Sequence, residues 1–308
     1  MIPIPGIVPW AVPKVGKQFL GTTFIPTPLL SKVAECDFEN RDVRVFVAWG
    51  GNYLRFVGRI TQEDICRAKG LGYHSRTEHL PTLLIDSSLD PSPVQAAMVW
   101  GSGIRGCLPT EKAPAFLQDL LDRVRAGDQL VSAERKAAVR NMLRHGSYKP
   151  AGRSKPASEY LLAAAATDGF PLVNGPVDVN NAVSLQWGYP ASVFDATLSG
   201  WDLLLRRGMP GERYVFNSSG QAIELEDLLC VCRKVDGAWV PCGNPVKDSM
   251  ATKTSAATTQ VVAVIFAPVE EPPADLRDAA ERFASLLASH CGATQTGFKL
   301  SSGPVGSG

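Results

Sequence analysis

Residues 174–195 have the sequence NGPVDVNNAVSLQWGYPASVFD, in which three short polar side chains interrupt an otherwise apolar run. The three are Asp178, Asn180 and Asn181. A short polar side chain in such a run must either bind neighbouring backbone or face a ligand. Two interpretations stay open: the side chains cap a helix that starts near Ala182, or they face a bound molecule.

Residues 247–259, with the sequence KDSMATKTSAATT, are dense in hydroxyl groups and precede the apolar run 261–266. A loop of this composition is either a capped surface turn or a small pocket of adaptable hydrogen-bond partners. The run that follows it is rich in β-branched residues, which is typical of a strand.

Together the two stretches resemble the B3/B4 domain, the aminoacyl-tRNA editing domain of the phenylalanyl-tRNA synthetase beta subunit and of its freestanding relatives. The first stretch matches the family's VDxxN…P…xD pattern at Val177-Asp178, Asn181, Pro190 and Asp195. The second is similar to the family's TKxTxxT segment, with Ser255 in place of the middle threonine. Residues 158–162 and 228–233 resemble two further family segments in the right order. The resemblance covers residues 95–290, and residues 1–90 have no recognised counterpart.

The resemblance implies an α+β fold, with a B3/B4-like body of mixed or antiparallel sheet and flanking helices, plus an N-terminal accessory region. We expect three parts: an accessory arm with strands at residues 1–94, the aminoacyl-tRNA domain at 95–292, and a flexible tail at 293–308. In the family, the pocket holds the aminoacyl-adenosine end of a misacylated tRNA. It hydrolyses the ester by positioning water, without a covalent nucleophile.

Transferred residue by residue, the family's pocket falls on side chains of altered chemistry. The Thr-Asn pair of the synthetase site falls on Asn180 and Asn181, and its histidine falls on Ser192. A glycine-containing loop falls near residues 248–249, where a carboxylate is gained. The glutamate that reads a tyrosine hydroxyl falls on Val264. Since valine cannot accept a hydrogen bond, we expect specificity for a tyrosyl group to be lost.

An aminoacyl ester is already activated, so a site needs only orientation, an oxyanion partner and an acceptor. Asn181 and Ser192 are candidates to hold the ester carbonyl or the terminal ribose. Asp248 or Asp195 is a candidate to bind the substrate ammonium or to act as base, although Asp195 has a structural alternative as a backbone cap. The candidate catalytic residues are Asn181, Ser192, Asp248 and Ser249, and the candidate substrate-binding residues are Asn180, Asp195, Thr252, Thr258 and Val264.

Three functions stay open for this pocket. With water as the acceptor, the protein is a trans-editing deacylase, which we place first. With an amine as the acceptor, it is an aminoacyl-tRNA-dependent amide-forming enzyme, such as a cyclodipeptide synthase or an aminoacyl transferase. The third possibility is a non-catalytic tRNA-binding module, because a fold does not imply an activity. We expect no cofactor and no metal, since the cysteines lack a CxxC partner pair and the histidines are dispersed.

The net charge of the 308 residues is only +1, which excludes a protein that is basic over its whole surface. Residues 123–155 nevertheless carry nine Lys or Arg against two acids, a local +7 that leaves −6 for the remainder. Within this block, Lys136, Arg140 and Arg144 recur at four-residue spacing and form one stripe of a helix. The stripe is either an ordinary solvated face or a surface for RNA phosphates. The candidate tRNA-binding residues are Arg135, Lys136, Arg140, Arg144, Lys149, Arg153 and Lys155.

Periodicity predicts helices and strands along most of the chain. Helices are expected at residues 110–125, 133–145, 158–168 and 275–289, where apolar residues recur at three- and four-residue spacing or follow a capping residue. A hairpin is expected from residues 43–47 and 53–60. Further strands are expected at residues 80–85, 95–100, 172–173, 182–185, 214–216, 228–233 and 261–266.

Hydrophobic residues make up 45% of the chain, but no apolar run reaches the 18 residues or so of a membrane span. The proline-rich start lacks the apolar core of a signal peptide. The seven cysteines are an odd number in a chain long enough to need no disulfide bonds. We therefore expect a cytoplasmic protein with aminoacyl-tRNA as its partner and no membrane contact; homo-oligomerisation stays open.

Overall fold

The computed structural model describes residues 44–49, 52–57, 80–105 and 107–301. The chain divides into two units, Met1–Glu78 and His79–Gly308. In the first unit, β1 (Arg44–Trp49) and β2 (Asn52–Val57) pair in antiparallel register, as expected for the hairpin. All other described elements belong to the second unit.

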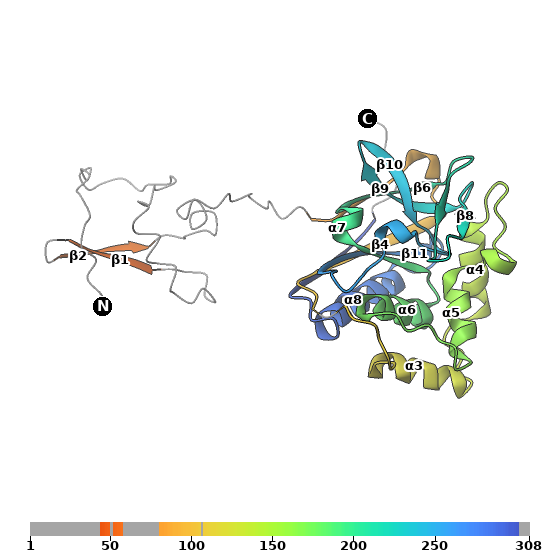
Figure 1. Cartoon of the computed structure of the whole chain (residues 1–308), viewed down its shortest axis with the longest axis horizontal. Coiled ribbons are helices and arrows are strands. Elements are labelled where there is room, and N and C mark those ends of the chain that lie inside the picture. The colour runs from red at the N-terminus through yellow and green to blue at the C-terminus, as the bar shows by residue number, and fades with distance from the viewer. Residues whose placement is uncertain (1–43, 50–51, 58–79, 106, 302–308) are drawn as a thin grey trace. The chain divides into compact units, whose positions relative to one another are not determined.

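The central sheet of the second unit has four antiparallel strands in the order β12-β4-β11-β5. They are β4 (Val94–Ser102), β5 (Ala191–Asp195), β11 (Gln260–Pro268) and β12 (Gln295–Leu300). Strand β11 is buried almost throughout, so both of its faces are covered. Helices α6 (Gly175–Trp187) and α8 (Pro273–Ser289) pack against this sheet (Figure 1).

A second sheet has the order β10-β9-β6-β3 and is mixed, because β3 (Thr82–Ile85) runs parallel to β6 (Asp202–Arg207). Its other strands are β9 (Leu229–Val235) and β10 (Ala238–Gly243), joined to their neighbours in antiparallel register. A small hairpin follows β6, formed by β7 (Arg213–Val215) and β8 (Ala222–Glu224). The unit is thus an α+β body with one antiparallel and one mixed four-stranded sheet.

Capping residues and prolines set the ends of the helices. The Ser132 hydroxyl accepts from the Arg135 backbone N–H at the start of α4, as expected. Helix α3 begins only after Pro114, five residues later than expected. The remaining helices and helical turns are α3 (Ala115–Arg125), α4 (Ala133–Leu143), α5 (Ala157–Ala165), α7 (Ala196–Ser199), η1 (Ser87–Leu89), η2 (Gly152–Ser154) and η3 (Met250–Thr252).

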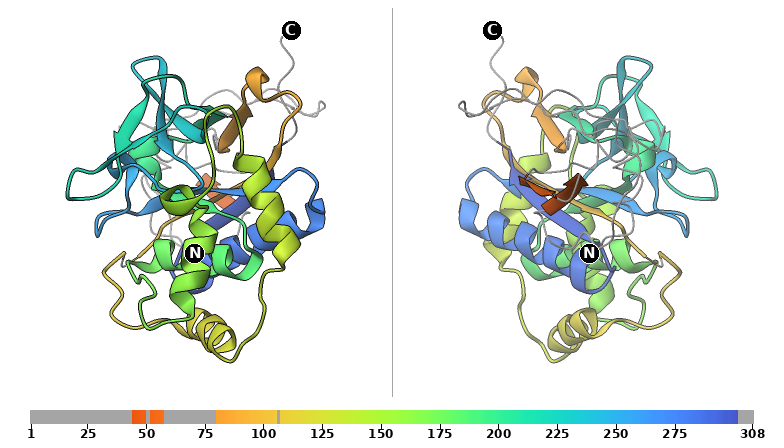
Figure 2. Two further views of the ribbon diagram at one scale, coloured as in Figure 1. Left: turned by 90° about the vertical axis from the view of Figure 1, so that its right-hand side faces the viewer. Right: turned by 90° about the vertical axis from the view of Figure 1, so that its left-hand side faces the viewer.

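The hydrophobic core has two parts. The main core lies around the central sheet and includes Val264, Phe266 and Phe283. A smaller cluster joins α3 to α5 and α6 through residues such as Leu117, Leu121 and Leu185. Helix α3 therefore lies at the opposite end of the unit from β9 and β10, as two further views show (Figure 2).

Four expectations differ from the structure. Residues 172–173 form no strand; they lead into α6, and the Val173 N–H donates to Asp178. Residues 182–185 are not a strand but the middle of α6, because the Asn174 side chain accepts from the Val177 N–H and caps a helix that starts at Gly175. The expected tail is wrong for residues 295–300, which form β12 on the edge of the central sheet and pack Phe298 against the core. Strand β3, placed in the N-terminal accessory part, pairs with β6 and belongs to the second unit.

Among the described residues, no helix combines the length and the apolar character needed to cross a bilayer.

Candidate functional site

A buried serine and a carboxylate meet between the two sheets. The Ser192 hydroxyl, on β5, donates to Asp248 Oδ1 over 2.7 Å. Asp248 follows β10 in a short turn, and the backbone N–H of Asn244 also donates to its Oδ1, over 3.3 Å. Ser192 is fully buried, whereas Asp248 keeps some exposed surface. Of the two, only Asp248 can therefore reach a bound molecule without rearrangement of the strand.

Burial raises the pKa of Asp248 from its ordinary value of 3.8 to about 7. Desolvation disfavours the charged carboxylate, and the hydrogen bonds from Ser192 and from backbone offset only part of that cost. A carboxyl group with a pKa near neutrality can accept and return a proton at physiological pH. The structure thus gives Asp248 the acid–base character of a catalytic group.

The turn that carries Asp248 depends on residues that were not among the candidates. A Cβ at Gly243 would lie 2.4 Å from the Phe194 ring and 2.8 Å from Asp248 Oδ1, so only glycine fits there. The Asn244 side chain accepts from the backbone N–H groups of residues 246 and 247 and fixes the turn. Its amide also donates to the hydroxyl of Tyr214, which in turn donates to the Lys247 carbonyl over 2.6 Å.

Burial also raises the pKa of Tyr214 well above its ordinary value, so this hydroxyl stays protonated and neutral. The Gly-Asn-Pro sequence at 243–245 is a turn signature that could have drawn attention to this loop. Nothing local in the sequence connects Tyr214 to it, since the two lie about 30 residues apart.

The two adjacent amides of α6 lie next to β5. Asn180 is buried, and its Nδ2 donates to the carbonyl of Ala191, the neighbour of Ser192, over 3.1 Å. Its Oδ1 has no hydrogen-bond partner among the described residues. Asn181 is half-buried, and its Oδ1 accepts only a long contact of 3.5 Å from Asn180. The α6 amides therefore retain free hydrogen-bonding capacity beside the strand that carries Ser192.

Asp195 and Thr258 form a separate, fully paired group at the end of β5. Asp195 Oδ1 accepts from the backbone N–H and the hydroxyl of Thr197, at 2.8 and 2.6 Å, and so caps α7. Its Oδ2 accepts from the Thr258 hydroxyl over 2.6 Å. That hydroxyl also accepts from the backbone N–H of Ser255. These contacts are those of the structural cap that was the alternative interpretation of Asp195.

The remaining candidates have structural contacts around the same turn. Ser249 caps η3 by accepting from the Ala251 N–H over 3.1 Å, and Thr252 donates to the Cys242 carbonyl over 3.3 Å. Val264 is buried in β11 directly opposite Ser192 in the sheet register. The structure thus brings Ser192, Asp248 and Val264 together and places Ser249 and Thr252 on the adjoining turn.

One member of the expected basic stripe, Arg140, and the neighbouring Arg135 are paired with acids from other elements. Arg140 makes two contacts of 2.5 Å with Glu159, and Arg135 pairs with Glu271 and Asp275. Arg123 and Arg125 pair with Asp128 and Asp168. The four paired acids that lie outside residues 123–155 lower the local net charge from +7 to +3.

Five cations of this block have no ion-pair partner within the part of the chain that the structure describes: Lys136, Arg144, Lys149, Arg153 and Lys155. All but Lys136 are exposed and lie on the connection between α4 and α5. This connection ends beside the site, because the N–H of Ala157, the first residue of α5, donates to the Pro245 carbonyl over 2.8 Å. Unpaired positive charge therefore lies on a connection whose end is held to the Asp248 turn.

Comparison with known proteins finds a family match over the part of the chain that contains the Asp248 turn. The family profile described as "B3/4 domain" matches residues 151–292. No curated protein matches the chain. A crystal structure of an N-terminal fragment of the phenylalanyl-tRNA synthetase beta subunit from Pyrococcus horikoshii is similar with a TM-score of 0.38 and 11% identity, over 87% of this chain and 68% of that one. The match to the B3/4 domain family covers residues 151–292, which include α6, β5 and the Asp248 turn.

Proposed function

We propose that this protein hydrolyses the ester bond of an aminoacyl-tRNA, with Asp248 as the general base. The observation that carries the proposal is the partly exposed Asp248 carboxyl, held by Ser192 at 2.7 Å and shifted to a pKa of about 7. A general base works best with a pKa near the working pH, and an ordinary aspartate is far too weak. The match of residues 151–292 to the B3/4 domain family supports an aminoacyl-tRNA as the substrate.

In the proposed reaction, Asp248 takes a proton from a water molecule as that water attacks the ester carbonyl. Ser192 is a positioning residue, because its buried hydroxyl donates to Asp248 and fixes the direction of the carboxylate. Asn181 is the candidate to donate to the carbonyl oxygen as negative charge develops there, since its amide has no short hydrogen bond to give up. Asp248 then returns the proton to the leaving ribose oxygen, which completes the proton balance.

The RNA part of the substrate requires positive charge beside this site. Three exposed cations, Lys149, Arg153 and Lys155, lie on the α4–α5 connection, and the first residue of α5 hydrogen-bonds to the Asp248 turn. Phosphate contacts from Lys and Arg position a nucleic acid without reading its sequence. Unlike Arg135 and Arg140, these side chains have no acid to release before they bind phosphate.

The test incubates the full chain with radiolabelled aminoacyl-tRNAs and follows the label. Release of free amino acid is expected. A dipeptide product would replace hydrolysis by amide formation, and intact but bound tRNA would leave a binding module. Asp248→Asn should abolish release, whereas Asp278→Asn, an exposed carboxyl on α8, should leave it unchanged.

Ser192→Ala separates a positioning role from a merely structural one. The Ser192 hydrogen bond lowers the pKa of Asp248, so its loss should move that pKa upward. Because the deprotonated carboxyl is the active form, the rate should rise with pH through about 7 in the wild type and at higher pH in the variant. An unchanged profile, with a rate reduced equally at every pH, would contradict the assignment of Asp248 as the base.

The charged loop has its own test. Replacing Lys149, Arg153 and Lys155 with Glu should weaken tRNA binding and reduce its dependence on salt. A matched control replaces Arg277 and Arg282, two exposed arginines on α8, in the same way. Equal loss in both variants would show that only net charge matters and that the loop has no special role.

A further inference from the structure

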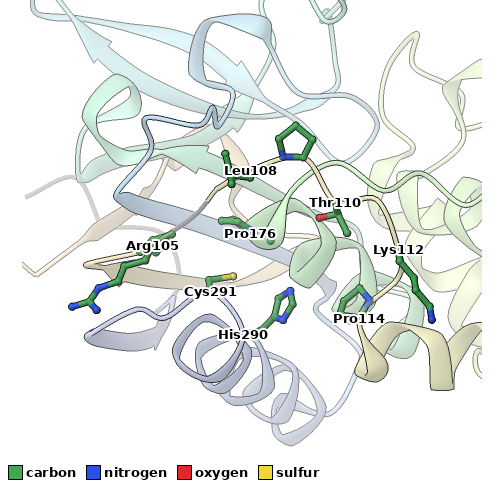
Figure 3. Close-up of a pocket in the computed structure, with 11 residues that line it drawn as sticks. Arg105, Leu108, Thr110, Lys112, Pro114, Pro176, His290 and Cys291 are labelled. Carbon is green, nitrogen blue, oxygen red and sulfur yellow. The ribbon is translucent and has the colours of Figure 1, made fainter.

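A pocket of about 240 Å³ lies at the N-terminus of α6, and none of the candidate catalytic residues lines it (Figure 3). Its walls come from three segments: the connection between β4 and α3, the first turn of α6 and the residues that follow α8. The pocket is open, because residues such as Leu108 and His290 on its wall are exposed. It is therefore accessible to a small molecule or to the end of a chain.

The side chains around this pocket are basic without an acidic counterpart. Arg105, Lys112 and His290 line it, and no carboxylate does. Figure 3 shows Arg105 and Lys112 at opposite ends of the pocket, with His290 and Thr110 between them. Both long side chains are exposed, and neither has an ion pair or a hydrogen bond to any residue that the structure describes. Each side chain can therefore rotate to contact a ligand in the pocket.

Asp178 is a fully buried carboxyl in the first turn of α6, and it does not line the pocket. Its Oδ1 accepts from the Val173 N–H over 2.9 Å, and its Oδ2 is buried without a hydrogen-bond partner within the described part of the chain. Burial raises its pKa, while the Thr110 hydroxyl and His290 lower it. The charge of this carboxyl is therefore shielded from the pocket surface.

The rest of the lining is apolar. Leu108, Pro109, Pro114 and Pro176 supply flat surfaces without polar side-chain atoms. Leu108 keeps 63% of its surface exposed and so adds apolar area to the pocket wall. The pocket therefore combines cations at its two ends with apolar contact area. A nucleotide has the complementary chemistry: a phosphate and a planar base.

We propose that this pocket binds the phosphate ester of a nucleoside, at a site separate from Asp248. Arg105 and Lys112 bind the phosphate oxygens, and the proline and leucine side chains contact the base. The phosphate ester can belong to a free nucleotide or to the phosphodiester chain of an RNA end. The proposal does not depend on ester hydrolysis, because it concerns binding alone.

The test titrates the isotope-labelled full chain with inorganic phosphate, AMP and the RNA trinucleotide CpCpA, and follows backbone amide shifts by NMR. Saturable shifts should appear at Thr110, Gly175 and Cys291, which line the pocket. The double variant Arg105→Ala/Lys112→Ala should weaken binding at least about tenfold, since it removes two charge-assisted hydrogen bonds. The control Arg277→Ala/Arg282→Ala, on the exposed face of α8, should bind like the wild type.

Comparison of the ligands identifies the source of the phosphate. Equal affinity for AMP and CpCpA indicates a free nucleotide, and tighter binding of CpCpA indicates an RNA chain. The proposal is overturned if no ligand gives saturable shifts at the pocket, or if the double variant binds as the wild type does. Both substituted residues are exposed, so the variant is expected to fold, and its circular dichroism spectrum checks this. A protein that fails to hydrolyse aminoacyl-tRNA at Asp248 should still show these shifts, so the two proposals can fail separately.

Discussion

The raised pKa of Asp248 predicts that Asp248→Asn stabilises the protein increasingly as the pH rises. The pKa is about 7 in the folded protein against an ordinary value of 3.8, so between these values the folded chain holds a proton that the unfolded chain has released. The stability that the protonated carboxyl contributes is fully present below the pKa of the unfolded chain. It is lost as the pH rises through the pKa of the folded protein. Each pH unit in this window costs the wild type about 1.36 kcal/mol.

Across the whole window this loss amounts to at most about 4 kcal/mol, and the partial exposure of Asp248 lowers the expectation to about 2–4 kcal/mol. Asparagine does not titrate, and its Oδ1 can still accept from Ser192 and from the Asn244 N–H. The substitution can also change the unfolding free energy by an amount that does not depend on pH. That amount cancels when the difference between variant and wild type is compared at different pH values.

Urea unfolding, followed by near-ultraviolet circular dichroism, measures this difference between about pH 4 and pH 8. The difference should grow in favour of the variant up to about pH 7 and then stay constant. Asp278→Asn, on the exposed face of α8, should give a flat line. A flat line for Asp248→Asn as well would mean that the carboxyl has an ordinary pKa, and the reasoning that makes it a general base would fail.

Two further substitutions test the packing of the site. Gly243→Ala should destabilise the fold by more than about 2 kcal/mol and abolish hydrolysis, because the added Cβ collides with the Phe194 ring. The control Gly169→Ala, where the nearest atom is 3.5 Å away, should do neither. Equal melting temperatures for the two variants would contradict this prediction. Arg140→Ala should cost about 1–3 kcal/mol in thermal unfolding, because Glu159, only 14% exposed, loses both of its short contacts. If Arg140 instead serves RNA, the variant will keep its stability and lose tRNA affinity.

Elements with a clear hydrophobic period could be predicted from the sequence. Residues 275–289 present apolar side chains at helical spacing, and the corresponding residues of α8, Leu276 and Phe283 among them, are buried. Helix α6 gave no such contrast, because it is covered on nearly all sides and buries polar as well as apolar side chains. A buried helix and a buried strand look alike in a short apolar run, which explains the wrong strand at 182–185. Strand β12 pairs with β4, almost 200 residues away, and no local pattern marks that contact.

The candidate site, like the fold, could be predicted from the sequence only in part. Ser192 and Asp248 were both candidates by resemblance, but the hydrogen bond between them spans 56 residues of sequence and appears only in the structure. The shift in the Asp248 pKa arises from burial between two sheets, and this burial cannot be read from the sequence. Asp195 is the converse case. A structural cap was the alternative interpretation of Asp195, and in the structure its Oδ1 caps α7 while its Oδ2 accepts from Thr258.

The charge of residues 123–155 shows why a count of cations along the sequence overstates a binding surface. The four cations of this block that pair with acids are all arginines, whose planar guanidinium fits a carboxylate in two-point contact. Three of the five unpaired ones are lysines, counted within the described residues. The arginine pairs hold α3, α4, α5 and α8 to their surroundings, and releasing them for phosphate would cost that contact. Within the described residues, the proposed attraction for RNA therefore rests on at most five cations of this block rather than nine. The exposed four of these lie on the connection between α4 and α5, which ends beside the Asp248 turn.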